Sequence, residues 1–226
     1  MPMEEEREMR FHDRSDAGRR LAERLGSVDT DNAVVIALPR GGVPVGAIVA
    51  EELGLPLDVI LVRKVGAPLQ PELAVGAVTD GDEMRLTVNR DIQAELGLSD
   101  EEIEDLARRQ LPEIERRRET YYKGRTPTPL SGKTVIVVDD GVATGATVNS
   151  ALRLIRAQRP ARLILALPVA PADTISRLEE HADEVVCLQT PTPFHAVGAH
   201  YADFSQVSDE EVIALLEKAH ARVTGA

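Results

Sequence analysis

The sequence has few cysteine and aromatic residues. It has a single cysteine and no tryptophan, and aromatic side chains make up 3% of its 226 residues. One cysteine excludes an internal disulfide. Cys187 lies within the apolar run 185–188, which is typical of a small buried hydrophobic side chain rather than of a reactive thiol.

Long hydrophobic segments are also absent. No apolar run approaches the roughly 20 residues that a membrane-spanning helix needs. Residues 1–10 are charged, and no apolar segment follows them. We therefore expect a cytoplasmic protein that has no membrane partner.

The sequence has fewer basic than acidic residues, which gives it a formal net charge of -12. Such a surface repels polyanions, so extended binding of DNA or RNA is not expected. The run Arg116 to Arg118 is flanked by glutamates and is interpreted as a solvated helix face. A small anionic ligand can still bind where cations gather locally.

Five short apolar runs predict the strands of one sheet. They are residues 33–38, 57–62, 134–138, 162–168 and 184–188. Helical patterns alternate with them, at residues 13–25, 43–53, 147–158 and 172–181. Uninterrupted apolar strands separated by helices are typical of a mainly parallel sheet with helices on both faces. We predict one α/β domain over residues 1–226.

A hairpin and two further helices are predicted in addition to this sheet. Residues 74–79 and 84–88 flank a glycine-containing turn and predict an antiparallel β-hairpin. A helix from Ser99 to Tyr122 is expected to kink or split at Pro112. A last helix starts at Ser208 and is expected to pack against the sheet or against a partner subunit.

The segment 135–147 carries the most specific chemistry. It reads as a buried strand, the acids Asp139 and Asp140, a loop of small residues, and the start of a helix. Successive backbone N–H groups in such a loop, with about half a positive charge at a helix N-terminus, suit a phosphate monoester. Thr144 and Thr147 add hydroxyl donors. An ordinary strand-to-helix turn is the alternative interpretation.

Two carboxylates beside a phosphate site would repel the bound phosphate unless they contact a different group. Ribose hydroxyls or a bound Mg²⁺ are suitable partners, and a phosphorylated sugar satisfies both halves of the segment. The spacing fits neither a Walker loop nor a dinucleotide-binding fingerprint.

Four apolar residues, two acids and Gly-Val-Ala-Thr-Gly-Ala-Thr resemble the phosphoribosyl pyrophosphate (PRPP) motif of type I phosphoribosyltransferases. The resemblance implies that Asp139 and Asp140 hold the ribose hydroxyls and contact Mg²⁺ only indirectly, through PRPP or water. It also implies that the loop residues bind the 5′-phosphate; these are Gly141, Val142, Ala143, Thr144, Gly145, Ala146 and Thr147. The sequence is most similar to bacterial phosphoribosyltransferases of unassigned acceptor.

Basic residues follow the first two predicted strands. Arg40 with Gly41 and Gly42 resembles the family's pyrophosphate loop, and Arg63 with Lys64 points further cations into the same crevice. Residues 66–78 resemble the family's mobile loop, which closes over the reaction. A surface loop with solvated bases is the alternative interpretation for this segment and for the pair Arg63 and Lys64.

The acceptor side is less specific. Phe194, Tyr201 and Phe204 cluster after the fifth strand, so the segment 189–207 is a candidate hood whose rings stack on a flat base. Hydrophobic anchoring of the C-terminal segment explains the same cluster equally well. Ala143 stands where hypoxanthine-guanine members of the family carry an aspartate, and Glu72 is a candidate substitute for that acid.

The resemblance implies Mg²⁺-assisted transfer of the 5-phosphoribosyl group to a nitrogenous base, purine-like by preference, with release of pyrophosphate. Arg40, Arg63, Lys64, Asp139 and Asp140 are the residues expected to carry the reaction. It also implies a homodimer and a role in purine salvage. Two alternatives stay open: a PRPP-binding regulator with little catalysis, and a phosphate-binding or assembly subunit in which the acids are incidental.

Overall fold

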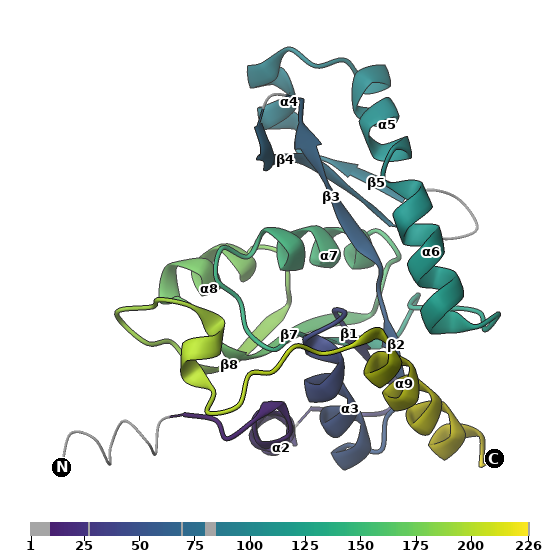
Figure 1. The fold of residues 1–226 in the computed structure, drawn as a ribbon, viewed down its shortest axis with the longest axis vertical. Helices are drawn as coiled ribbons and strands as arrows, with labels where there is room; N and C mark the ends of the chain where they lie inside the picture. The colour runs from purple at the N-terminus through teal and green to yellow at the C-terminus, as the bar shows by residue number, and fades with distance from the viewer. Residues whose placement is uncertain (1–9, 27, 69, 80–84, 226) are drawn as a thin grey trace.

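The computed structural model describes residues 10–26, 28–68, 70–79 and 85–225 (Figure 1). Its main sheet has five parallel strands in the order β2-β1-β6-β7-β8. Their bounds are β1 (Ala33–Ala37), β2 (Leu57–Val59), β6 (Thr134–Val138), β7 (Arg162–Val169) and β8 (Glu184–Gln189). The predicted α/β class with a five-stranded parallel sheet is confirmed.

Alternate residues of each central strand enter two different cores. In β1, Val35 and Ala37 join the cluster that contains residues of α2 (Arg14–Leu25), α3 (Gly42–Glu52) and α9 (Asp209–Thr224). Val34 and Ile36 join the cluster with α7 (Ala146–Arg156) and α8 (Ala172–Leu178). Figure 1 shows α7 and α8 above the sheet and α2 and α3 below it. Both faces of the sheet are therefore covered, which explains the continuous apolar runs.

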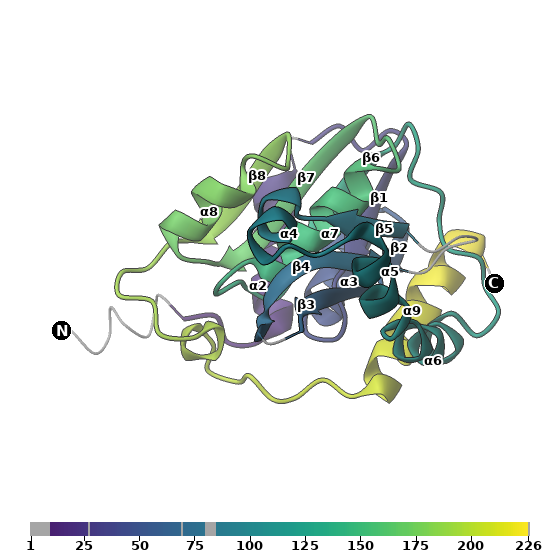
Figure 2. The same ribbon diagram turned by 90° about the horizontal axis from the view of Figure 1, so that it is seen from above.

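A second sheet lies beyond α7. It contains β3 (Val62–Ala67), β4 (Gln70–Thr79) and β5 (Arg85–Val88), all antiparallel. It contacts α7, and Figure 2 shows β4 and β5 crossing over that helix. The hairpin pairing of residues 74–79 with the strand that ends at Val88 is confirmed, although its turn, residues 80–84, falls outside the described residues.

Two expectations about this region are wrong. The run 57–62 is not one strand: β2 stops at Val59, and the chain enters the second sheet at Val62. The segment 66–78 is not a loop either, because β3 and β4 cover almost all of it and pair with each other. Arg63 and Lys64 interrupt the apolar pattern of β3, whereas residues 75–79 of β4 are all buried.

The helical segment after β5 divides into three helices. They are α4 (Arg90–Leu96), which we did not predict, α5 (Asp100–Arg108) and α6 (Leu111–Tyr122). Ser99 and Glu102 form the predicted capping box of α5, and Pro112 lies in the first turn of α6, where a missing N–H costs nothing. α9 packs against α3 and α6. Among the described residues, no helix combines the length and the apolarity needed to cross a membrane.

The N-terminal residues pair with the segment after β8. Phe11 forms a parallel bridge with Tyr201, with its N–H donating to the His200 carbonyl at 2.9 Å. A short 3₁₀ helix, η1 (Val197–His200), precedes Tyr201. Phe11 is fully buried, and its ring centroid lies 5.3 Å from that of Tyr201. This pairing places the start of α2 beside the predicted hood.

Candidate active site

The loops that follow β1 and β6 lie in direct contact at the carboxyl edge of the sheet. The Leu38 N–H donates to the Val138 carbonyl at 2.9 Å. A Cβ built on Gly41 would lie 2.1 Å from the Asp140 Oδ2, and one on Gly42 would lie 2.8 Å from the Val138 oxygen. The Pro39–Arg40 peptide is cis. The glycine pair therefore allows the acid pair and the Arg40 turn to meet.

The acids have unusual electrostatics. Burial and the neighbouring Asp140 carboxylate raise the pKa of Asp139 well above its ordinary value. Burial also raises the pKa of Asp140, while the Arg14 guanidinium opposes that rise. The Asp139 Oδ1 accepts a hydrogen bond from the Asp140 N–H at 2.9 Å. A hydroxyl donor or a cation placed against these carboxylates would therefore stabilise their charged form.

The segment from Gly141 to Thr147 forms a loop and the first two residues of α7. Gly145 has a φ of 79°, which favours glycine, and it is the residue before the helix. The Asn149 N–H donates to the Gly145 carbonyl at 2.8 Å as the first helical bond, so the preceding N–H groups of the helix start have no carbonyl within the helix. Ala143, Thr144, Ala146 and Thr147 are exposed. The loop has the open, donor-rich form that a phosphate requires.

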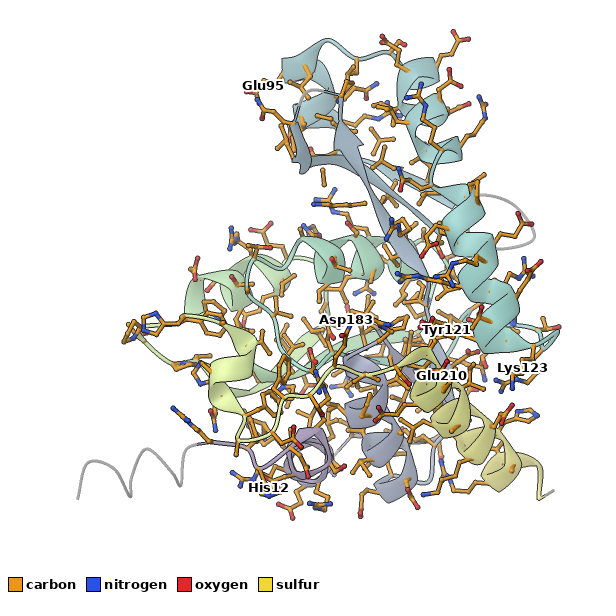
Figure 3. All side chains as sticks on the ribbon, in the orientation of Figure 1. His12, Glu95, Tyr121, Lys123, Asp183 and Glu210 are labelled. Carbon is orange, nitrogen blue, oxygen red and sulfur yellow. The ribbon has the colours of Figure 1, made fainter. Side chains whose placement is uncertain are left out.

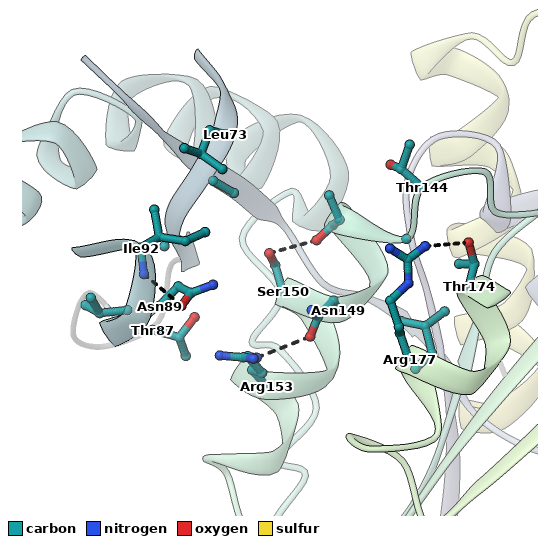
Figure 4. Close-up of a pocket in the computed structure, with 16 residues that line it drawn as sticks. Leu73, Thr87, Asn89, Ile92, Thr144, Asn149, Ser150, Arg153, Thr174 and Arg177 are labelled. Carbon is teal, nitrogen blue, oxygen red and sulfur yellow. Dashed lines mark hydrogen bonds between the residues drawn. The ribbon is translucent and has the colours of Figure 1, made fainter. Parts of the chain in front are cut away.

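Thr174 supports this loop from α8. Its hydroxyl donates to the Ala143 carbonyl at 2.8 Å, and its methyl group would lie 3.0 Å from a Cβ at Gly145. Arg177 donates to the same hydroxyl at 3.0 Å. Figure 4 shows Thr144, Thr174 and Arg177 at one end of a pocket of about 300 Å³ that continues along α7 to Arg153. The pocket extends under β4 and β5.

Arg40 is held at the edge of the site by the start of α9. Its guanidinium lies 3.7 Å from the Asp209 carboxylate, which also accepts a hydrogen bond from the Tyr121 hydroxyl at 2.6 Å. Burial and that carboxylate raise the pKa of Tyr121 to about 12. Figure 3 shows Tyr121 on α6 close to Glu210 in the first turn of α9. Arg40 also lines a cavity with Arg14, Asp140 and Phe204.

A second cationic cavity, of about 620 Å³, lies between β3 and α6. Arg63 and Lys64 line it, and they lie within β3 rather than after a strand of the main sheet. Arg109 and Arg117 line the same cavity, as does Thr147 from the first turn of α7. The cavity therefore connects the basic pair to the start of α7.

A phosphoribosyl transferase domain model matches residues 11–203. The chain belongs to this family. Two Mycobacterium tuberculosis proteins, from strains H37Rv and CDC 1551 and each named "Putative phosphoribosyl transferase", are 47% identical to it over 210 residues. The match covers 93% of this chain and 47% of each relative, so the chain spans about half the length of the curated relatives it matches.

A solved structure shares the fold of this chain. A Thermus thermophilus protein of known crystal structure is 44% identical, with a TM-score of 0.85, and the match covers 93% of this chain and 99% of that one. The resemblance inferred from residues 135–147 is thereby confirmed at the level of family and fold.

For the hood segment of this phosphoribosyl transferase chain, the structure favours hydrophobic anchoring, the second of the two interpretations of its aromatic rings. Tyr201 is 4% exposed, and its hydroxyl donates to the Asp140 carbonyl at 2.5 Å, so its ring is not available as a stacking surface. Phe204 has the Arg14 guanidinium 4.0 Å from its ring centroid and Gly198 against its edge. Phe194 is half-buried and stacks on His200 at 5.4 Å. The aromatic cluster mainly anchors the segment beside Asp140.

Several residues at the site were missed from the sequence, among them three arginines. Arg14 looked like one more polar residue of an amphipathic helix, and Arg117 belonged to a charged run that we interpreted as solvated. Arg109 carried no signal that separates it from its neighbours. The side chain of Glu72, the candidate acid, lies outside what the structure describes. Cys187 has a pKa raised by burial and takes no part in the site.

Proposed function

We propose that this chain is a PRPP-dependent phosphoribosyltransferase that transfers the 5-phosphoribosyl group to a nitrogen of a flat base and releases pyrophosphate. The observation that carries the proposal is the contact of Asp139 and Asp140 with the Gly41–Gly42 turn beside an open helix-start loop. One ligand that carries a ribose, a phosphate and a diphosphate matches these three features together.

In this assignment the acids accept hydrogen bonds from the ribose hydroxyls. The 5′-phosphate occupies the loop from Gly141 to Thr147, where backbone N–H groups and two threonine hydroxyls are donors. Holding both ends of the phosphoribosyl unit fixes its C1 atom against the Arg40 turn. Fixing the reacting carbon in this way lowers the entropic part of the barrier.

The diphosphate then faces Arg40 on one side and Arg63 with Lys64 on the other. When the bond between C1 and the diphosphate oxygen breaks, the ribose gains oxocarbenium-like charge and the leaving group gains negative charge. The cations stabilise the leaving group, and the base nitrogen attacks C1 and loses its proton. Nothing in this scheme needs a covalent bond to the protein.

Mg²⁺ fits this site only together with PRPP. Among the described residues, no cluster of three or more histidine, cysteine or acidic side chains is arranged to hold a metal. Asp139 and Asp140 would hold the ion indirectly, through ribose hydroxyls or water. When bound, it neutralises charge on the diphosphate. The proposed cofactor is therefore Mg²⁺ delivered as the PRPP complex.

We propose a purine-like acceptor. The cavity lined by Arg14, Arg40, Asp140 and Phe204 lies between the acids and the segment 204–207, where an acceptor must approach C1. Ala143 offers no carboxylate to the base, so an acceptor that loses its proton directly to water suits the site. Placement in purine salvage follows from this acceptor.

The direct test is pyrophosphate release from PRPP with Mg²⁺ across a panel of purines, pyrimidines and small amines. Release with at least one purine is the expected result. Asp139→Asn/Asp140→Asn should abolish both release and PRPP binding. Asp105→Asn, which changes an exposed carboxylate of α5 paired with Arg108, should leave both intact. Failure of the unaltered protein to bind PRPP would exclude the proposal.

A PRPP-binding regulator is the second candidate. Two observations favour it: Asp140 and Arg40 are already paired, with Arg14 and Asp209, and position 143 lacks an acid. Tight PRPP binding without pyrophosphate release from any member of the panel would support this candidate over the transferase.

We also propose that the protein acts in the cytoplasm as a homodimer. The absence of an internal disulfide and the family resemblance support these two statements. Sedimentation velocity at micromolar concentration tests the dimer, and a single species of monomer mass would contradict it.

A further inference from the structure

Arg14, near the start of α2, connects the acid pair to the hood. Its Nε and one terminal nitrogen both lie 2.8 Å from the Asp140 Oδ2. Its other terminal nitrogen donates to the Ser205 carbonyl at 2.8 Å, and its Cζ lies 4.0 Å from the Phe204 ring centroid. The side chain is 11% exposed. A guanidinium with this many fixed contacts has one defined orientation.

The charge of Arg14 matters because the acids are buried. Burial favours the neutral form of both carboxyls, and the Arg14 charge opposes this effect on each of them. A protonated Asp140 carboxyl is a weaker hydrogen-bond acceptor than a carboxylate. Its own proton would also compete with a ribose hydroxyl for the same position.

The direction of the two hydrogen bonds is as important as the charge. Both end on Oδ2, which leaves Oδ1 of Asp140 to accept from a sugar hydroxyl. The aromatic face of Phe204 and the Ser205 carbonyl prevent the guanidinium from swinging away. Arg14 thereby couples the hood to the orientation of the carboxylate.

We propose that Arg14 is a positioning residue for PRPP: its two contacts with Oδ2 hold the Asp140 carboxylate beside a fixed positive charge, with Oδ1 toward the ribose. This inference rests on the proposed function, because it assumes that the acids bind a ribose. It adds a residue from the N-terminal helix to a site otherwise built from strand ends.

The experiment compares Arg14→Gln and Arg14→Lys with a matched control. Arg20→Gln is that control, because Arg20 lies on the same helix, pairs with Asp16 at 2.9 Å and has its Cζ 5.4 Å from the Phe11 ring centroid, away from the acids. PRPP affinity with Mg²⁺ is measured by titration calorimetry from pH 5 to pH 8.5. The phosphates of PRPP titrate identically in every titration, so differences between variants report on the protein.

We expect Arg14→Gln to weaken PRPP binding at least tenfold at pH 7, and to move the midpoint pH at which affinity is lost upward, because the charge that opposes the effect of burial on Asp140 is gone. Arg14→Lys retains the positive charge, so its midpoint pH should lie closer to that of the unaltered protein than the midpoint pH of Arg14→Gln does. Arg20→Gln should match the unaltered protein in both affinity and midpoint. Circular dichroism and a melting temperature establish that each variant is folded.

An unchanged midpoint in Arg14→Gln would overturn the inference. So would an equal loss of affinity at every pH in the Gln and Lys variants, because that pattern reports hood packing rather than charge. If the unaltered protein fails to bind PRPP at any pH, the proposed function itself fails, which is distinct from failure of the role of Arg14.

Discussion

Asp140 occupies the space that a side chain on residue 41 would need, since an ideal Cβ on Gly41 would lie 2.1 Å from the Asp140 Oδ2. Gly41 has a φ of -59°, which any residue adopts. Close approach, and not backbone conformation, therefore explains the glycine. The loops after β1 and β6 form one unit in which the Arg40 turn is built against the acid.

Gly41→Ala should disrupt the contact between the Arg40 turn and Asp140. The added methyl group must push the Asp140 carboxylate away from its Arg14 partner, at a cost of about 1–3 kcal/mol in the free energy of unfolding. PRPP affinity should fall below detection. Urea unfolding and calorimetry measure the two effects. Gly26→Ala, where the added Cβ meets the Glu23 carbonyl at 3.3 Å, should change neither by much, and equal behaviour of the two variants would contradict the argument.

Asp139→Asn should separate stability from function. The folded-state pKa of Asp139 lies well above its ordinary value of 3.8, so this residue favours the folded state at low pH. That contribution is lost as pH rises from about 4 through the folded-state pKa. An asparagine has no charge to bury and keeps the oxygen that accepts from the Asp140 N–H.

At pH 7 we therefore expect Asp139→Asn to be more stable than the unaltered protein by about 1–3 kcal/mol, and its stability to vary less between pH 4 and pH 7. Thermal and urea unfolding across this range measure both. PRPP binding should be lost in the same variant. A loss of stability at pH 7 would show that the Asp139 charge is compensated in the folded protein.

The main sheet could be predicted from sequence because its central strands are covered on both faces. Runs such as 134–138 admit few other structures, and the acids that follow such a run must then lie at the carboxyl edge. The second sheet was harder. Arg63 and Lys64 interrupt the apolar pattern of β3, and a strand that leaves one sheet for another gives no local signal of where it goes.

The candidate site was predicted where it is local in sequence and missed where it is not. Asp139 to Thr147 form one continuous segment, so a phosphate site could be predicted there from their spacing. Arg14 meets Asp140 only because Phe11 pairs with Tyr201, and this long-range contact has no counterpart in the spacing of residues. Phe194, Tyr201 and Phe204 are close in sequence, but the burial of Tyr201 depends on Phe11, which packs against it from the N-terminal segment.

Tyr201→Phe should weaken PRPP binding through the hood. It removes the 2.5 Å hydrogen bond from the Tyr201 hydroxyl to the Asp140 carbonyl and should cost about 1–2 kcal/mol of stability. Tyr122→Phe is a matched control, because it removes a 2.6 Å bond to the Val59 carbonyl, away from the acids. Both variants should lose similar stability in urea, and only Tyr201→Phe should lose PRPP affinity. Equal PRPP affinity in both would show that the hydroxyl has only a structural role.

Arg117 should contribute to pyrophosphate binding, whereas its neighbour Arg116 should not. Both guanidinium groups bond to Glu113, at 2.8 Å and 2.9 Å respectively, and together they lower the pKa of that carboxyl to about 2. Arg116 is 54% exposed. Arg117 is 27% exposed and lines the cavity that contains Arg63 and Lys64.

Arg117→Gln should therefore weaken pyrophosphate binding about three- to tenfold at low ionic strength, with a smaller effect at 0.5 M salt because screening shortens the reach of the charge. Arg116→Gln removes the same charge and the same Glu113 partner, so it corrects for general electrostatics and for helix stability. Titration calorimetry with Mg²⁺-pyrophosphate measures both. An equal loss in the two variants would mean that α6 acts through its overall charge, while a loss confined to Arg117→Gln would place its guanidinium on the diphosphate.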